Sequence, residues 1–370
     1  MTNDQTLRVL VVDDTIVYRK IVCDVLAELP GVEVVGVANN GKIAMSRIAS
    51  LKPDLLTLDI EMPEMNGIEV LEHIKTEAPD VGAIMLSTLT QEGGEMTIRA
   101  LQLGAFDFIP KPQGGTMEEN KKAVRNALSR LVKAFARRRE ISNILREQIS
   151  TTQPRGKDLL REQALGVQHI GAMRPKRTKS EVVAIGVSTG GPNALSRMLP
   201  KLPPDLGAPV LVVQHMPPIF TQSLAKSLNS KCAIEVAEAV DGQPLSNNVA
   251  LIAPGGKQMK VVAGADGKSR IVRITDDPPE NSCKPSADYL FRSVAHHFVG
   301  RATGVIMTGM GSDGTLGLKL MKRNGATVIA QDEATCVVYG MPKAVVDSGI
   351  ADVVVPLDRI SEEILKTVRN

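Results

Sequence analysis

Short apolar runs alternate with stretches of helical periodicity in two separate parts of the chain. In the first part the apolar runs cover residues 7–12, 32–38, 54–58, 81–86 and 106–109. Between these runs apolar side chains recur at helical spacing, as Ile68, Leu71 and Ile74 do. Five strand–helix units in succession predict an α/β fold with an open, doubly wound parallel sheet and helices on both faces.

The second part begins at residue 182 and shows the same alternation. Its apolar runs cover residues 182–185, 209–213, 249–252, 260–262, 270–274, 304–307 and 327–330. The stretch 249–274 contains the turn residues Ala265-Asp266-Gly267 and predicts an antiparallel hairpin. The other runs predict a second α/β sheet that is mainly parallel, and the two parts share no repeated motif.

A different pattern separates the two parts. Val124, Leu128, Leu131 and Phe135 predict that the last helix of the first part continues as an amphipathic rod. From 151 to 179 the periodicity is lost, and Gln, Gly, Pro and basic residues predict a linker. We therefore expect one domain at 5–125, a helical extension and basic linker at 126–180, and a second domain at 181–368.

Charge is concentrated in this middle segment. The chain has a formal net charge of +3, but residues 130–179 hold 13 Lys and Arg against four Asp and Glu, so the remainder is net negative. A basic tract of this kind is typical of a solvated linker, and binding to nucleic acid is the less favoured interpretation.

Composition narrows the class of protein further. Hydrophobic residues make up 43% of the chain and aromatic residues only 2%, so a globular protein is predicted and base-stacking platforms are not. The four cysteines are far apart and form no CxxC pair, which is typical of reduced thiols in the cytoplasm. No apolar stretch approaches the roughly 18 residues of a membrane span, and Met1-Thr2-Asn3-Asp4 does not begin a signal peptide. We therefore expect a cytoplasmic protein without direct membrane insertion.

Polar residues follow the predicted strands of the first domain. They are Asp13 and Asp14, Asp59, Ser87 and Lys111. The carboxyl ends of parallel strands meet at one edge of a sheet, where three carboxylates repel one another unless a cation lies between them. Oxygen ligands alone suit Mg²⁺, and a lysine and a hydroxyl beside them suit a phosphoryl group on an aspartate. Each acid taken alone is more simply a helix cap or a solvated loop residue.

These residues lie in motifs that resemble a response-regulator receiver domain. The motifs are VLVVDD at 9–14, LTLDIEMPEMNG at 56–67, MLST at 85–88 and FIPKP at 108–112. The resemblance implies a flavodoxin-like sheet of order 2-1-3-4-5 and assigns roles to individual residues. Asp59 would accept phosphate, and Asp13, Asp14, Asp59 and the carbonyl of Glu61 would hold Mg²⁺. Ser87 and Lys111 would bind the phosphoryl oxygens, Phe108 would move in switching, and Lys111-Pro112 would be a cis peptide.

The second domain opens on a glycine-rich turn that carries a serine. Gly186-x-Ser188-x-Gly190 follows an apolar run and precedes a helix, as in a nucleophile elbow. Such a turn exposes the hydroxyl and directs backbone amides at a developing oxyanion. A phosphate-binding loop or a simple tight turn fits the same pattern, although the Lys-Ser/Thr ending of a Walker loop is missing.

A serine nucleophile needs a base, and His215 is the best placed candidate. The chain has five histidines: His73, His169, His215, His296 and His297. Of these, His215 follows an apolar run, at the sheet edge where Ser188 should also emerge. Asp313 follows the run 304–307 and can orient it. Taken singly, His215 could be a structural hydrogen-bonding group and Asp313 a helix cap. The order Ser188, His215, Asp313 differs from that of an ordinary α/β-hydrolase.

Residues 181–368 resemble the catalytic domain of the chemotaxis response-regulator protein-glutamate methylesterases. The motifs are IGVSTGGP at 185–192, VVQHMPPIFTQSLA at 212–225, APGG at 253–256, KPSADYLF at 284–291, MTGMGSDG at 307–314 and VYGMPKA at 338–344. The resemblance implies Ser188 as nucleophile, His215 as general base, Asp313 as its orienting acid, and the backbone amides of Thr189 and Met310 as the oxyanion hole. At Ser282-Cys283-Lys284 the chain departs from the His and Arg that many relatives carry before Pro-Ser.

Together the two resemblances imply a phosphorylation-activated serine hydrolase. It would demethylate glutamate methyl esters on chemoreceptors, release methanol and also deamidate glutamines, with a chemotaxis histidine kinase as phosphodonor and no metal in the ester chemistry. One alternative is a receiver joined to a module that binds a nucleotide phosphate, but the second domain lacks Walker and dinucleotide motifs. A DNA-binding response regulator is less favoured, because no helix-turn-helix pattern is present.

Overall fold

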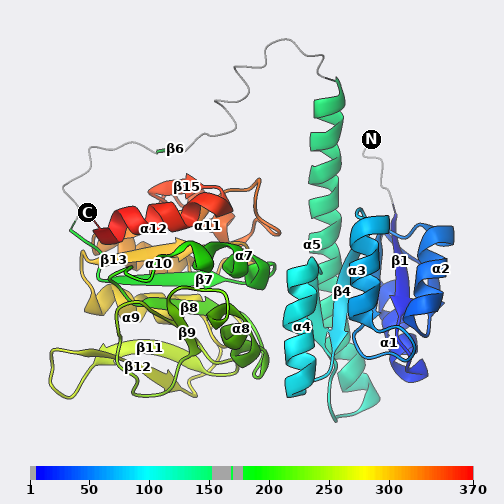
Figure 1. Ribbon diagram of the computed structural model, residues 1–370, viewed down its shortest axis with the longest axis horizontal. Helices are drawn as coiled ribbons and strands as arrows, with labels where there is room; N and C mark the ends of the chain where they lie inside the picture. Colours follow the sequence, from blue (N-terminus) through cyan, green and yellow to red (C-terminus); the bar gives the residue numbers. More distant parts are fainter. Residues whose placement is uncertain (1–5, 152–167, 170–177, 370) are drawn as a thin grey trace. The chain divides into compact units, whose positions relative to one another are not determined.

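The computed structural model describes residues 6–151, 168–169 and 178–369, and the chain divides into two compact units at Thr151/Thr152 (Figure 1). Each unit has its own sheet and its own apolar core. Most of the predicted linker, residues 152–167 and 170–177, lies outside the described residues.

The first unit is a five-stranded parallel sheet of order β2-β1-β3-β4-β5, as predicted. Its strands are β1 (Leu7–Val12), β2 (Val32–Ala38), β3 (Leu55–Asp59), β4 (Gly82–Ser87) and β5 (Asp107–Pro110). Its helices are α1 (Ile16–Ala27), α2 (Gly41–Leu51), α3 (Gly67–Glu77), α4 (Gln91–Leu103) and α5 (Met117–Thr151). Helix α1 packs on α5, and α3 contacts both α2 and α4. The predicted amphipathic rod is part of α5, where Leu128 and Phe135 are buried.

The second unit contains an eight-stranded sheet of order β6-β15-β14-β13-β7-β8-β10-β9, in which only β6 runs antiparallel to its neighbour. Its strands are β6 (Gln168–His169), β7 (Val182–Val187), β8 (Val210–Gln214), β9 (Glu235–Glu238), β10 (Val249–Ile252), β13 (Ala302–Ile306), β14 (Thr327–Gln331) and β15 (Val353–Val355). The helices are α7 (Gly191–Met198), α8 (Phe220–Asn229), α9 (Ala287–His297), α10 (Thr315–Arg323), α11 (Met341–Asp347) and α12 (Ile360–Arg369). A separate antiparallel pair consists of β11 (Gln258–Ala263) and β12 (Arg270–Thr275).

Three details differ from the sequence-based expectations. Strand β10 pairs in parallel with β8 and β9, so the hairpin contains only β11 and β12. Strands β6, β9 and β15 were not predicted, because they have two, four and three residues, and β6 lies in the stretch that was expected to be linker. The cis peptide found among the described residues joins Lys284 to Pro285, so the expectation for Lys111-Pro112 is wrong. No helix in the described ranges is long and apolar enough to cross a membrane.

Both sheets have a point where the strand order reverses, and this is where an open α/β sheet forms a crevice. In the first unit β1 lies between β2 and β3, and in the second unit β7 lies between β8 and β13. The carboxyl ends of these strands therefore mark the places where each unit can hold a functional site.

Candidate functional site

The acidic residues predicted in the first unit lie together at the carboxyl edge of its sheet. Asp13 and Asp14 follow β1, Asp59 ends β3, and each offers a carboxylate oxygen within 4.8 Å of the others. Lys111 follows β5, and its Nζ lies 2.6 Å from Asp59 Oδ2 and 3.0 Å from Asp13 Oδ2. A single ammonium group thus faces two buried carboxylates, and its one positive charge leaves the cluster net negative.

The electrostatics of this cluster leave it able to accept a cation. Burial raises the pKa of Asp59 to about 6, and the opposing effect of Lys111 does not cancel it. Burial likewise raises the pKa of Asp13 against the effect of Lys111. Within the described chain, Lys111 Nζ at 3.0 Å is the one side-chain partner of the buried Asp13 Oδ2. An oxygen-only donor set with a net negative charge fits Mg²⁺.

The other residues predicted here lie around the cluster. Ser87 ends β4, and its hydroxyl accepts a hydrogen bond from Thr97 Oγ1 (2.6 Å) in α4 and so faces that helix. The carboxylate of Glu61 accepts a hydrogen bond from Thr88 Oγ1 (3.0 Å), and Phe108 is half-buried in β5. The sequence analysis missed Tyr18 of α1, whose ring centre lies 5.0 Å from Lys111 Nζ. No motif residue marked Tyr18, because this contact depends on how α1 packs.

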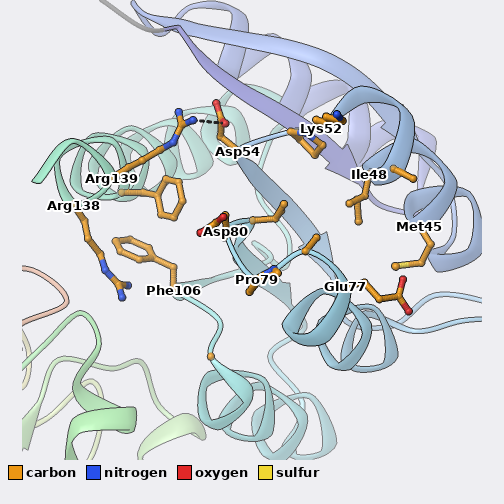
Figure 2. Close-up of a pocket in the computed structure, with 17 residues that line it drawn as sticks. Met45, Ile48, Lys52, Asp54, Glu77, Pro79, Asp80, Phe106, Arg138 and Arg139 are labelled. Carbon is orange, nitrogen blue, oxygen red and sulfur yellow. Dashed lines mark ion pairs between the residues drawn. The ribbon is translucent and has the colours of Figure 1, made fainter. Parts of the chain in front are cut away.

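Figure 2 shows a pocket of this unit, which has a volume of about 800 Å³. Its lining contains no residue of the acidic cluster. It is at the opposite edge of the sheet, where Asp54 precedes β3, Val81 precedes β4 and Phe106 precedes β5. The Arg139–Asp54 ion pair (2.6 Å) crosses one side of it. None of the predicted site residues lines this pocket, so its size does not make it the functional site.

The serine turn of the second unit has the geometry that its glycines require. Gly190 has φ +76°, and a Cβ there would lie 2.5 Å from Val337 Cβ, so only glycine fits. The backbone N–H of Ser188 donates to Thr308 O (3.0 Å), and its carbonyl accepts from Gly191 N (2.7 Å). Ser188 is thereby held between the end of β7 and the start of α7.

His215 lies beside Ser188 because their strands are neighbours. Strand β7 pairs with β8, and the N–H of His215 donates to Val187 O (3.1 Å). The ring Nε2 is 2.8 Å from Asp313 Oδ2, and the His215 side chain is only 13% exposed. Among the described residues the Ser188 hydroxyl has no hydrogen bond, to His215 or to any other group. The structure thus joins His215 to Asp313 and places Ser188 next to them without completing the third contact.

Asp313 is surrounded by hydrogen-bond donors. Besides His215, it accepts from Asn281 Nδ2 (2.9 Å), Ser286 Oγ (2.8 Å) and the N–H groups of Ala287 (2.7 Å) and Asp288 (3.2 Å) at the start of α9. Burial alone would raise the pKa of Asp313, but its bonds to His215, Asn281 and Ala287 hold that pKa well below its ordinary value. The carboxylate therefore stays ionised and fixes the orientation of the ring.

The pKa of His215 shifts in the opposite direction to that of Asp313. Burial alone would lower its pKa, but its contacts with Asp313 and Cys283 outweigh burial and raise the pKa to about 9. Cys283 Sγ lies 3.7 Å from Nδ1, the ring nitrogen that Asp313 does not occupy. The departure from the family pattern at residues 282–284 marked this loop, but nothing in the sequence indicated that its thiol contacts His215.

The predicted oxyanion groups are next to Ser188. A Cβ on Gly309 would lie 2.7 Å from Ser188 Cβ, so the backbone that carries Met310 passes directly against the serine. Within the described chain, neither the N–H of Thr189 nor that of Met310 is donated to another group. His296 and His297 lie at the end of α9 opposite to the end that Asp313 caps.

Comparisons with known proteins agree with this arrangement. The family model "CheB methylesterase" matches residues 183–364, and "Response regulator receiver domain" matches residues 9–125. A protein-glutamate methylesterase/protein-glutamine glutaminase of Desulfotalea psychrophila is 57% identical over 99% of each chain. Its counterpart in Bacillus subtilis is 43% identical over 98% of this chain and 99% of its own.

Solved structures match the two units separately. The CheB methylesterase catalytic domain of Thermotoga maritima is 40% identical, with a TM-score of 0.49, over 51% of this chain and 99% of its own. The response regulator domain of Thermotoga maritima CheB is 41% identical, with a TM-score of 0.32, over 35% of this chain and 97% of its own.

The full-length identity and the two family models lead to one assignment. The chain carries a receiver domain followed by a methylesterase domain, and its relatives span the same length. This chain is an enzyme that belongs to the protein-glutamate methylesterase/protein-glutamine glutaminase family of chemotaxis response regulators.

Proposed function

We propose that this chain is a phosphorylation-activated serine hydrolase that cleaves the methyl esters of glutamate side chains on chemoreceptors. The observation that carries the proposal is the His215–Asp313 hydrogen bond (2.8 Å) at the carboxyl end of β8, beside Ser188 at the end of β7. An imidazole fixed by a buried carboxylate next to a serine on a tight turn is the arrangement that acyl transfer requires.

In the proposed reaction each step falls to particular atoms. Asp313 occupies Nε2 of His215, so Nδ1 takes the proton of the Ser188 hydroxyl as Oγ attacks the ester carbonyl. The N–H groups of Thr189 and Met310 stabilise the oxyanion. The proton on Nδ1 then passes to the leaving methoxide, and methanol departs. Water, deprotonated at Nδ1, hydrolyses the acyl-enzyme and restores glutamate. A glutamine amide follows the same route with ammonia as the leaving group.

The acidic cluster of the receiver is proposed to control this reaction. Asp59 accepts the phosphoryl group from a chemotaxis histidine kinase, and Lys111, already 2.6 Å from its carboxylate, pairs with the phosphoryl oxygens. Ser87 contributes once its hydroxyl turns from Thr97, and Phe108 moves with it. Asp13, Asp14, Asp59 and the carbonyl of Glu61 would hold Mg²⁺, which when bound neutralises charge on the phosphoryl oxygens. The reaction takes place in the cytoplasm, where the phosphodonor and receptor helices meet.

The test is methanol release from methylated receptor by the full chain. Ser188→Ala removes the nucleophile and lowers the rate about 10⁴- to 10⁶-fold, while phosphorylation of Asp59 by a small phosphodonor continues. Ser196→Ala is the matched control, because Ser196 is in α7 and its hydroxyl has no partner among the described residues. Near-normal methanol release by the Ser188→Ala protein would show that the nucleophile is another group.

A further inference from the structure

Cys283 lies in the methylesterase site and has no role in the proposed reaction. Its Sγ is 3.7 Å from His215 Nδ1 and 3.4 Å from the carbonyl oxygen of Asn281, and its side chain is half-buried. His215, Cys283 and Asp313 bring their polar atoms within 4.8 Å of one another. The three side chains are arranged as in a catalytic triad that uses a thiol. The carboxylate of Asp313 contacts one nitrogen of the His215 ring, and Cys283 Sγ contacts the other.

The loop that carries Cys283 is fixed to the site. Glu280 and Cys283 exchange two backbone hydrogen bonds of 3.1 and 2.8 Å, which close a tight turn. The side chain of Asn281, inside this turn, donates to Asp313 Oδ1 and to Asp288 Oδ2, each at 2.9 Å. The position of the thiol is therefore determined by the same contacts that orient Asp313.

The position of Cys283 Sγ matters because only one ring nitrogen of His215 is not hydrogen-bonded to Asp313. Nε2 is bonded to Asp313, so Ser188 must deliver its proton to Nδ1, and Nδ1 is the atom that Sγ faces. A group attached to Sγ would lie against Nδ1 and separate it from Ser188.

The other cysteines have different surroundings. Burial raises the pKa of Cys23, raises that of Cys232 to about 11 and raises that of Cys336 strongly. In the described part of the chain, none of these three thiols is hydrogen-bonded to a histidine ring. Cys283 is thus the one described thiol whose sulfur contacts a histidine ring nitrogen.

We propose that Cys283 is a site of reversible covalent modification, at which a small-molecule disulfide forms a mixed disulfide and switches off ester hydrolysis. When the His215 ring is neutral, the S–H proton passes to Nδ1, and the thiolate attacks one sulfur of the disulfide. The S–S bond breaks, so one half joins Sγ and the other half leaves as a thiolate. Cys283 is oxidised while the disulfide is reduced, and a thiol reductant reverses the exchange. The loss of activity rests on the proposed roles of Ser188 and His215, but the modification itself does not.

The test uses the full-length protein, freed of reductant, with EDTA present and glutathione disulfide as the probe. We expect peptide mass mapping to find glutathione on Cys283 before Cys23, Cys232 or Cys336. Methanol release should fall about 100-fold at full modification, because the adduct obstructs Nδ1 of the general base without removing the ring, and it should return after reduction. Each variant is compared with its own untreated rate. Cys283→Ser should lose no activity on treatment, whereas Cys232→Ser should be as sensitive as the wild type.

Further measurements separate the possible failures. His215→Ala should slow the modification of Cys283 by about tenfold, because the proton acceptor is gone. Ser188→Ala should be modified at the wild-type rate, so this readout stands even if another group is the nucleophile. Inhibition that persists in Cys283→Ser, or full activity in protein carrying glutathione on Cys283, would overturn the proposal. Preferential modification of Cys232 or Cys336 would do the same.

Discussion

Asp59 and Asp313 are buried aspartates at the carboxyl edges of two similar sheets, yet their pKa values shift in opposite directions. Asp59 has one cationic neighbour, Lys111, and lies next to two other acids, so burial prevails and its pKa rises to about 6. Asp313 accepts hydrogen bonds from five groups, and its pKa falls. The number of donors around each carboxylate, and not its burial, decides the direction.

The difference matches the chemistry proposed for each residue. A carboxylate that accepts a phosphoryl group needs a free lone pair, and the side-chain hydrogen bond that the described chain gives the Asp59 carboxylate comes from Lys111 alone, at Oδ2 (2.6 Å). A carboxylate that orients an imidazole needs all its lone pairs occupied, as those of Asp313 are. The proposal thus gives the same residue type, on the same class of fold, the role of nucleophile in one unit and of positioning group in the other.

The largest effect is expected at the base that Asp313 holds. His215→Ala should lower methanol release by about 10⁴-fold or more, because Ser188 and His215 act as a unit. His296→Ala is the control, since His296 lies at the opposite end of α9 and should retain turnover. A dispensable His215 together with an indispensable His296 would contradict the assignment.

Asp313→Asn tests the orienting role itself. The amide preserves the shape of the site but presents a donor to one of its neighbours and removes the charge that stabilises the imidazolium. We expect a loss of up to about 10⁴-fold in kcat with the fold retained, checked by circular dichroism. Asp347→Asn, an exposed acid paired with Lys343, should leave the rate unchanged. Equal activity of the Asp313→Asn protein would mean that Asp313 only caps α9.

The Asp59→Asn variant should abolish activation by phosphorylation and leave the basal rate of ester hydrolysis unchanged. With a small phosphodonor and Mg²⁺, the wild-type chain should gain activity by about 5- to 150-fold, a typical allosteric coupling, while the variant stays at the basal rate. We expect the unphosphorylated receiver to inhibit the methylesterase domain, so a fragment of residues 178–370, which begins where Thr178 is hydrogen-bonded to Gly300, should be active without the phosphodonor. If the fragment is no more active than the unphosphorylated full chain, the receiver activates the site and does not inhibit it.

The smallest effects concern pH. Because the raised pKa of His215 keeps the ring protonated at neutral pH, kcat/KM should increase from pH 6.5 to about 9.

The stabilisation from the protonated ring is fully present below pH 6.5 and is lost as the pH rises through about 9, so the free energy of unfolding should fall by about 3 kcal/mol over that interval. The opposite sign applies to Asp313, whose stabilisation disappears below its ordinary pKa of 3.8. Urea titrations and rate profiles measure both, and a rate that is flat above pH 7 would contradict the raised pKa.

The sequence by itself determined the fold class and the identities of the residues at the strand ends. Asp13, Asp59, Ser188 and His215 were found because the carboxyl ends of neighbouring parallel strands must meet at one edge, whatever the surrounding loops do. Short strands such as β15, which has three residues, were not predicted, because an apolar run of that length does not distinguish a strand from other structure.

Only the tertiary structure decided which atoms face one another. The Nε2–Asp313 bond, the contact of Cys283 with Nδ1 and the Tyr18 ring near Lys111 join residues from different loops and helices. Cys283 and His215 are separated by 68 positions in the chain. No periodicity or motif encodes such a distance, because it is set by how the turn at Glu280–Cys283 and the start of α9 pack against the edge of the sheet.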